Sequence, residues 1–315
     1  MSRVLAALIV SIFLFGCAAP TETTQPSPTS LPSPSPSPTA IPFELEIVDP
    51  LSFVSGEDTL VGRLYLPISE EPVPAVVMVH GSGRRTRDES VRIATELAEA
   101  GIAVFRYDKR GVGDSEGRYS GVGPSNSERL LLELALDAIA AVEFIQQMPE
   151  INSLQVGVLG NSQAGWIMPI AASQSQEISF AVLIVGPAVS VAVENFYSAL
   201  TGQDAANTTS ERLDEISADL ADFEGRGFDP RESITQMDIP AIWILGGRDE
   251  SIPTRETITI LEEIREEYDK DFTIHLYPDA THNLVNFETG EFHDFIEEIV
   301  LEWIFENLPS LENSV

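Results

Sequence analysis

Hydrophobic and polar residues alternate in the first part of the chain that has the composition of a folded protein. The segments FELEIV (43–48) and TLVGRLYLP (59–67) carry apolar side chains at nearly every second position. A period of two is typical of half-buried antiparallel strands, in which one face packs on the core and the other meets water. The pattern predicts that these two segments form an opening hairpin.

Continuous apolar runs follow the hairpin and alternate with segments of helical character. Such runs are typical of parallel strands that are covered on both faces. The expected strands are AVVMVHG (75–81), IAVFRYD (102–108), LQVGVLG (154–160), FAVLIVG (180–186), PAIWILGG (240–247) and FTIHLYP (272–278). Helices are expected near 89–100, over 127–148, directly after residue 162, over 254–268 and over 291–307, with a polar helical insertion near 190–235. This alternation predicts an α/β fold with a mostly parallel central sheet and helices on both faces.

The first forty residues have a different composition. Arg3 precedes an apolar run that ends near Phe15 and is too short to span a bilayer comfortably, so residues 1–16 are expected to be a cleaved signal peptide. The run leads into Cys17, and LFGC resembles a bacterial lipobox, in which the thiol becomes acylated. An ordinary signal peptide with an incidental cysteine is the alternative. Residues 17–42 then form a Pro/Ser/Thr-rich tether, which predicts an extracytoplasmic protein anchored to a membrane by lipid.

The remaining segment, 43–315, has the length of one large α/β domain. The formal net charge is −32, from 50 acidic and 18 basic residues, and the field of such a chain repels polyanions. Nucleic acid is therefore excluded as a partner. The single cysteine cannot form an intramolecular disulfide, and no cluster of His, Cys or Asp has metal-ligand spacing. We expect neither a metal nor an organic cofactor, and charge and composition leave the oligomeric state open.

Two serines compete as a catalytic nucleophile. The literal Gly-x-Ser-x-Gly pattern of a nucleophile elbow occurs only around Ser115, in a glycine-rich loop with no helix directly behind it. Ser162 lies in GNSQAG, with Ala164 in place of the second glycine, but a predicted strand precedes it and an apolar helical run follows it. The elbow needs a sharp strand-to-helix turn, so we predict that Ser162 is the nucleophile. Ser115 is then a decoy.

A serine needs a base within hydrogen-bond distance and a carboxylate that orients the base. Of the four histidines, only His282 follows a predicted strand directly, on a loop at the carboxyl edge of the sheet. Asp249 follows the preceding strand, at a separation that fits one helix-strand unit. Glu250 is the rival acid, whereas Asp279 is expected to shape the turn before His282. The sequence predicts a triad of Ser162, Asp249 and His282.

An oxyanion hole needs backbone N–H groups that point at the developing negative charge. The residue after the nucleophile, Gln163, is expected to supply one. The second is expected from the loop after the HG of His80–Gly81, with Ser82 as first choice and Gly83 next. His80 itself is expected to be a structural hydrogen-bonding residue of that loop.

With these motifs in place, the chain resembles the α/β-hydrolase superfamily over nearly all residues from about 45 to 308. The resemblance is carried by AVVMVHGSG, FRYDKRGVGDSEG, VGVLGNSQAGW, ILGGRDESIP and PDATHN, in that order. It implies the α/β-hydrolase fold with a small helical cap, here near 187–237. The wording of the second and third segments is similar to bacterial carboxylesterases, acyl-thioester hydrolases and serine peptidase-like members. It implies that Asp108, Arg110, Gly111, Asp114 and Ser115 fix the turn beneath the site.

The resemblance and the triad together predict a serine hydrolase that cleaves small to medium carboxylic esters or thioesters through an acyl-enzyme. A peptidase acting on short peptides uses the same triad and is the first alternative. A catalytically silent surface binding module is the second. Candidate substrate-pocket residues are Trp166, Phe196, Tyr197 and Arg84, and packing within the protein is the alternative for the three aromatic residues. The cluster of Arg84, Arg85 and Arg87 raises the hypothesis of an anionic substrate group, against a locally paired loop.

Overall fold

The computed structural model describes residues 41–309. The signal peptide at 1–16, the lipid attachment at Cys17 and nearly all of the tether lie outside the described residues, so these stay predictions. Among the helices within 41–309, none has both the length and the apolar character needed to span a membrane.

The predicted hairpin is formed by β1 (Leu45–Ser55) and β2 (Asp58–Pro67), which pair antiparallel around Gly56. Strand β1 is longer than predicted because the pairing register shifts between Val48 and Leu51. Pro50 lies in this irregularity and has no N–H to donate to the ladder. Because of this interruption, the alternation of apolar and polar residues does not reveal that the strand continues beyond Val48.

The described residues form an eight-stranded sheet in the order β1-β2-β4-β3-β5-β6-β7-β8. The further strands are β3 (Val73–Val79), β4 (Ala103–Tyr107), β5 (Ile151–Asn161), β6 (Ala181–Ile184), β7 (Ala241–Gly246) and β8 (Phe272–Tyr277). All pairs from β4 to β8 are parallel, and the pairs β1-β2 and β2-β4 are antiparallel. The predicted fold, a mostly parallel sheet with an N-terminal antiparallel hairpin, is confirmed.

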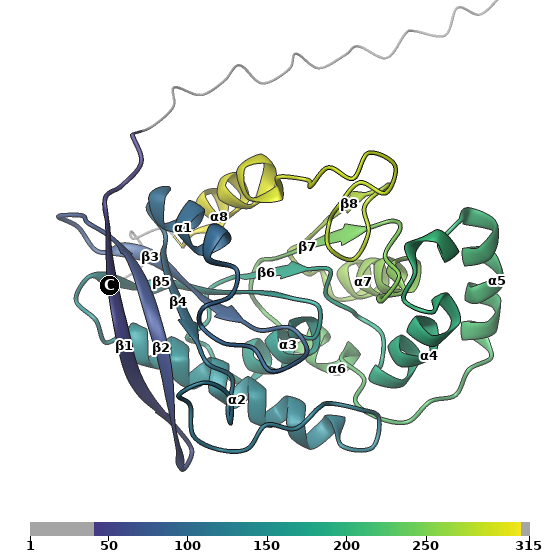
Figure 1. The fold of residues 1–315 in the computed structure, drawn as a ribbon, viewed down its shortest axis with the longest axis horizontal. Coiled ribbons are helices and arrows are strands. Elements are labelled where there is room, and N and C mark those ends of the chain that lie inside the picture. The colour runs from purple at the N-terminus through teal and green to yellow at the C-terminus, as the bar shows by residue number, and fades with distance from the viewer. Residues whose placement is uncertain (1–40, 310–315) are drawn as a thin grey trace, which may run out of the picture. The chain divides into compact units, whose positions relative to one another are not determined.

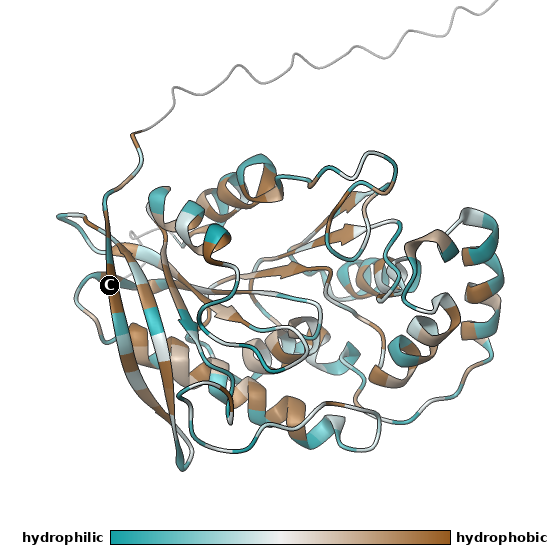
Figure 2. Ribbon diagram, viewed as in Figure 1, coloured by the Kyte–Doolittle hydropathy of each residue, from teal (hydrophilic) through white to brown (hydrophobic). Residues whose placement is uncertain are grey.

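Helices cover both faces of this sheet (Figure 1). On one face, α1 (Val91–Glu99) and α8 (Leu301–Asn307) pack against inward residues of the strands. The other face is covered by α2 (Ser127–Ile145), α3 (Ala164–Gln174) and α7 (Thr254–Tyr268). Figure 2 shows hydrophobic residues concentrated on the central strands, as expected for strands buried on both faces. The buried sheet is the rigid frame from which the loops of the site project.

The C-terminal helix begins later than predicted. It starts with a π-helical turn, η2 (Ile296–Val300), and continues as α8, so the expectation of a helix from residue 291 is wrong. Residues 291–294 instead belong to a loop in which Phe292 bridges to Val285 and the N–H of His293 donates to Leu284 O. These backbone bonds hold the segment against the loop after β8, so it cannot join the helix. His293 therefore precedes the helix in which it was expected.

Between β6 and β7 the chain forms α4 (Val191–Thr201), the 3₁₀ turn η1 (Ala205–Asn207), α5 (Ser210–Ala221) and α6 (Arg231–Gln236). Ser190 and Thr209 start α4 and α5 because their side chains accept hydrogen bonds from N–H groups of the first turn. Gly202 ends α4 in the left-handed conformation. Buried residues of α4 and α5 form a small apolar cluster of their own. This β6–β7 insertion occupies the segment predicted as a cap.

Candidate active site

Ser162 lies on a sharp turn between β5 and α3. The strand ends at Asn161 and the helix begins at Ala164. The backbone of Ser162 is in the left-handed region, with φ of 54°, which side chains other than glycine seldom adopt. Such strain at a functional residue persists only where the surrounding structure enforces it. This is the geometry of a nucleophile elbow.

Two glycines explain why the sequence folds in this way. A Cβ at Gly160 would lie 2.5 Å from the Ala164 Cβ, and one at Gly165 would lie 2.5 Å from Gly186 Cα. Both approaches are too close for any side chain. The close approach of α3 to Gly186 therefore requires glycine at position 165, one residue after the position of the motif's second glycine. This is why Ala164 is compatible with the turn.

The structure brings the three predicted triad residues together. His282 Nε2 lies 3.2 Å from Ser162 Oγ, and its Nδ1 lies 2.9 Å from Asp249 Oδ2. The acid follows β7 and the base follows β8, and both loops leave the carboxyl edge of the parallel sheet beside the elbow. The three side chains form one hydrogen-bonded chain.

Backbone groups hold the acid in place. Asp249 is 1% exposed, and its Oδ1 accepts from the N–H groups of Ser251 at 2.8 Å and Ile252 at 2.7 Å. The rival Glu250 does not reach the imidazole of His282, because its Oε2 accepts instead from the His282 backbone N–H at 3.2 Å. Asp279 contacts the side chain of Asn286 and lies 3.4 Å from His293 Nε2, and it makes no contact with the imidazole of His282. The geometry therefore favours Asp249 as the orienting acid.

Three carboxyl groups set the charge around His282. Burial of the ring acts against protonation, but the charge and hydrogen bond of Asp249 and the charges of Glu250 and Glu194 raise the pKa of His282 above its ordinary value. Glu194 is on α4, and burial raises its own pKa to about 7. No sequence motif marks Glu194, since it comes from the β6–β7 insertion. Only folding reveals its place near His282.

The predicted oxyanion donors also lie beside the nucleophile. Gln163 is buried and is the residue directly before α3. The N–H groups of Ser82, Gly83 and Gln163 have no acceptor among residues 41–309. Gly81 is packed against Asn161, since a Cβ there would lie 3.1 Å from Asn161 O, so the loop after β3 directly adjoins the elbow. Free donors in this position suit an oxyanion hole.

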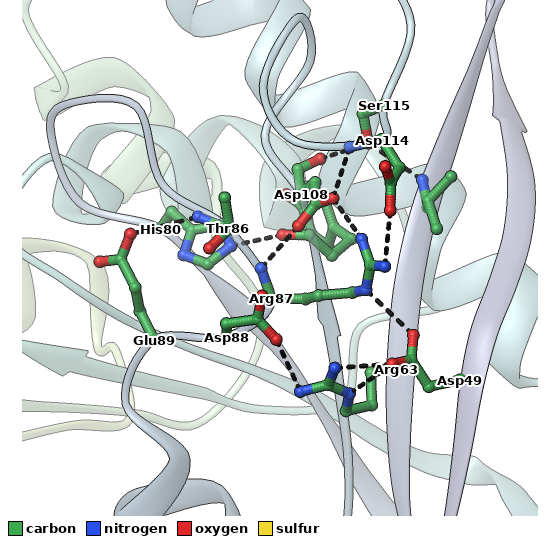
Figure 3. A network of polar contacts seen from close by, with 12 residues as sticks. Asp49, Arg63, His80, Thr86, Arg87, Asp88, Glu89, Asp108, Asp114 and Ser115 are labelled. Carbon is green, nitrogen blue, oxygen red and sulfur yellow. Dashed lines mark hydrogen bonds and ion pairs between the residues drawn. The ribbon is translucent and has the colours of Figure 1, made fainter.

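The competing serine has a structural setting. Ser115 Oγ is buried, donates to Asp108 O at 2.7 Å and accepts from the Val61 N–H at 2.9 Å. Figure 3 shows it within a polar network centred on Arg87 and Asp108. Both hydrogen-bonding functions of the hydroxyl are thus engaged. The one histidine drawn in this network, His80, donates to Tyr107 O and not to Ser115. Ser115 fixes the turn.

His80 is a buried structural residue, as expected. Its Nε2 donates to the carbonyl of Tyr107, which ties the end of β3 to the end of β4. Burial lowers the pKa of His80 to about 4, so the ring is neutral at physiological pH.

The three arginines of the loop after β3 have different surroundings. Arg87 pairs with Asp49, Asp108 and Asp114, as Figure 3 shows. Arg85 pairs with Glu89 at 2.9 Å. These contacts support the locally paired loop rather than a cluster that selects anions. Arg84 differs, because it donates to Gly111 O and its guanidinium lies 5.3 Å from the centre of the Tyr119 ring.

The predicted apolar pocket residues pack within the protein. Trp166 is 4% exposed and donates from Nε1 to Val189 O, and Phe196 stacks on Phe223 with ring centres 4.2 Å apart. Tyr197 is 2% exposed, and its hydroxyl donates to Asp249 O at 2.6 Å. The contacts of Trp166 and Tyr197 are those of core and bracing residues, so they do not support a substrate-lining role. These contacts agree with the alternative in which the aromatic residues pack within the protein.

Comparison with known proteins finds hydrolases among the relatives of this chain. Residues 70–224 match the family model described as serine aminopeptidase, S33. Esterase EstD from Thermotoga maritima is 28% identical over 273 residues, which cover 77% of this chain and 63% of the relative. The match thus spans less than two thirds of that esterase.

Solved structures show the same fold at low sequence identity. An esterase from Pyrococcus furiosus superposes with a TM-score of 0.57 at 18% identity, covering 84% of this chain and 90% of the other. The acylaminoacyl peptidase of Pyrococcus horikoshii gives a TM-score of 0.60 at 17% identity, covering 87% of this chain and 43% of the peptidase. Esterases and peptidases are therefore both among the proteins this chain resembles.

Proposed function

Because the chain is an α/β-hydrolase of the serine hydrolase kind, we propose that it cleaves carboxylic esters or thioesters through an acyl-enzyme on Ser162. The observation that carries the proposal is the hydrogen-bonded chain from Asp249 through His282 to Ser162, with distances of 2.9 and 3.2 Å. Fold alone does not decide substrate, so the proposal rests on this site.

In the acylation half-reaction, Ser162 Oγ attacks the substrate carbonyl carbon while His282 Nε2 takes its proton. Asp249 stabilises the resulting imidazolium through Nδ1. The tetrahedral intermediate carries its negative charge on the former carbonyl oxygen, which the N–H groups of Gln163 and Ser82 or Gly83 stabilise. Collapse expels the alcohol or thiol, which receives the proton from His282, and leaves the acyl ester of Ser162.

In deacylation the same groups act on water. His282 takes a proton from the water molecule as its oxygen attacks the acyl carbon. A second tetrahedral intermediate forms in the same oxyanion hole. Its collapse releases the carboxylic acid and returns the proton to Ser162 Oγ. The triad and the backbone donors thus act in both half-reactions.

A peptidase acting on substrates with a free amine is the second candidate, and Glu194 favours it. Glu194 lies one turn before Tyr197 on the same side of α4, and Tyr197 donates directly to the Asp249 loop. Thr201 continues this side and donates to Glu250 O at 2.5 Å. Glu194 thus faces the triad and has no cationic partner among residues 41–309. A carboxylate in this place suits a substrate ammonium group.

A substrate panel separates the two candidates. The protein is expected to hydrolyse p-nitrophenyl esters of short and medium acyl chains, and turnover of none of them would contradict the ester proposal. If the site selects a free amine, E194Q is expected to lower kcat/KM for aminoacyl esters and aminoacyl p-nitroanilides more than kcat/KM for neutral esters. The ratio of the first value to the second is expected to fall by about 5- to 50-fold. An unchanged ratio would exclude the second candidate.

The same variant has an expected pH signature. The negative charge of Glu194, which is present above its pKa of about 7, favours the imidazolium, so E194Q is expected to lower the pKa of His282 and to move the acid limb of the kcat/KM profile to lower pH.

We further propose that the protein is held at the extracytoplasmic side of a bacterial membrane by lipid on Cys17. The support is sequence alone: the apolar run, the lipobox-like LFGC and the tether that follows. Replacement C17S is expected to move the protein from the membrane fraction to the soluble fraction of the expressing cell. Retention of C17S in the membrane fraction would contradict the lipid anchor.

A further inference from the structure

Lys109 is a buried lysine two residues after the end of β4, and 3% of it is exposed. Its Nζ donates hydrogen bonds to Gly81 O at 2.9 Å and to Gln163 Oε1 at 2.7 Å. Within the described part of the chain, no carboxylate forms an ion pair with it. Burial of an ammonium group without a carboxylate partner costs free energy, so its position calls for a compensating role.

The first contact acts on a peptide unit of the predicted oxyanion hole. Gly81 O and the Ser82 N–H belong to the same peptide group, and in a trans peptide these two groups point in opposite directions. The ammonium that holds Gly81 O therefore also fixes the direction of the Ser82 N–H. It polarises the peptide group as well, which strengthens the N–H as a donor.

The second contact acts on the other predicted donor. Gln163 supplies a backbone N–H next to the nucleophile, and its side-chain oxygen is held by Lys109. The neutral amide of Gln163 thus gives the ammonium an acceptor without cancelling its charge. One side chain in this way connects the loop after β3 with the elbow after β5.

We propose that Lys109 is a positioning residue of the oxyanion hole, which aligns the donors of Ser82 and Gln163 and stabilises the oxyanion by its buried positive charge. This inference rests on the proposed function. Arg84, Arg85 and Arg87 lie on the loop after β3, whereas Lys109 follows β4.

The charged groups around Lys109 make this role dependent on pH. Burial and, to a lesser extent, the charge of Arg85 lower the pKa of Lys109 to about 8, against the opposing effect of the charge of Asp137. Asp137 is paired with Arg110, and the nearby His80 is neutral. The positive charge is therefore present below about pH 8 and is lost above it.

The test compares Lys109→Met with Lys270→Met. The chain has two lysines, and Lys270 pairs with Asp238 before β7, at the opposite edge of the sheet from the site. Lys109→Met is expected to lower kcat for a p-nitrophenyl ester about 10- to 100-fold with little change in KM, because aligned oxyanion donors act on the transition state. Lys270→Met is expected to keep the wild-type kcat.

The pH profile separates a positioning role from a purely structural one. Wild-type kcat is expected to fall above about pH 8, and this alkaline limb is expected to be absent in Lys109→Met and displaced to higher pH in Lys109→Arg. A Lys109→Met kcat within twofold of wild type would overturn the inference, as would an unchanged alkaline limb.

If Lys109→Met does not fold, a measurement on the wild-type protein still tests the inference. With ¹³C label in both lysine side chains, the signal that persists in Lys270→Met belongs to Lys109. Its titration midpoint is expected to coincide with the alkaline limb of kcat, and midpoints that differ by more than about one pH unit would overturn the inference. Absence of acyl hydrolysis by the wild type would contradict the proposed function itself, which is a distinguishable result.

Discussion

The S162A variant is expected to lose ester hydrolysis by roughly 10⁴- to 10⁶-fold in kcat, with no loss of folded structure. In the proposed mechanism Ser162 supplies the oxygen that forms the acyl-enzyme, and alanine has no oxygen to replace it. The hydroxyl is half-buried and bonds only to His282 among the described residues, so its removal breaks a single hydrogen bond. The measurement is turnover of a p-nitrophenyl ester beside thermal unfolding.

The matched control is S115A, at the serine that literal motif matching would select. Ser115 bonds to Asp108 O and the Val61 N–H, so its loss is expected to lower the free energy of unfolding by about 1–3 kcal/mol. Its kcat is expected to stay within a few-fold of wild type. Inactive S115A together with active S162A would reverse the assignment.

The D249N variant is expected to lower kcat roughly 10³- to 10⁴-fold. The N–H groups of Ser251 and Ile252 already donate to Oδ1 of residue 249, so the amide oxygen of asparagine is expected to keep that position. Its NH₂ group then faces His282 Nδ1, which must accept rather than donate. The imidazole proton then lies on Nε2, so Nε2 cannot accept the proton of Ser162.

Glu250 provides the matched control for this variant. In E250Q the amide oxygen can still accept from the His282 backbone N–H, so the loop geometry is expected to persist. Its kcat is expected to remain within about threefold to tenfold of wild type, with the His282 pKa lowered because one neighbouring charge is removed. A larger loss in E250Q than in D249N would make Glu250 the orienting acid.

Much of the fold follows from local patterns in the sequence. Buried parallel strands give continuous apolar runs, and the helix over Thr254–Tyr268 has the predicted bounds. The strand-to-helix context of Ser162 outweighed the literal motif at Ser115 because the elbow is defined by backbone geometry. The order and spacing of Asp249 and His282 then sufficed to name the three residues that the structure brings together.

Features that depend on tertiary contacts could not be predicted in the same way. The late start of the C-terminal helix results from bonds between residues 291–294 and the loop after β8. Trp166 and Tyr197 carry no local signal of whether they line a pocket or pack beneath it. Lys109 and Glu194 are single charged residues whose burial beside the site arises only when segments distant in sequence meet.

The central claim is that Ser162 is the reactive nucleophile, and fluorophosphonate labelling followed by peptide mass spectrometry tests it most directly. We expect one modified peptide, with the phosphonyl group on Ser162, and no labelling of S162A under the same conditions. Labelling of S115A is expected to match the wild type. Modification of another serine, or labelling that persists in S162A, would contradict the assignment of Ser162.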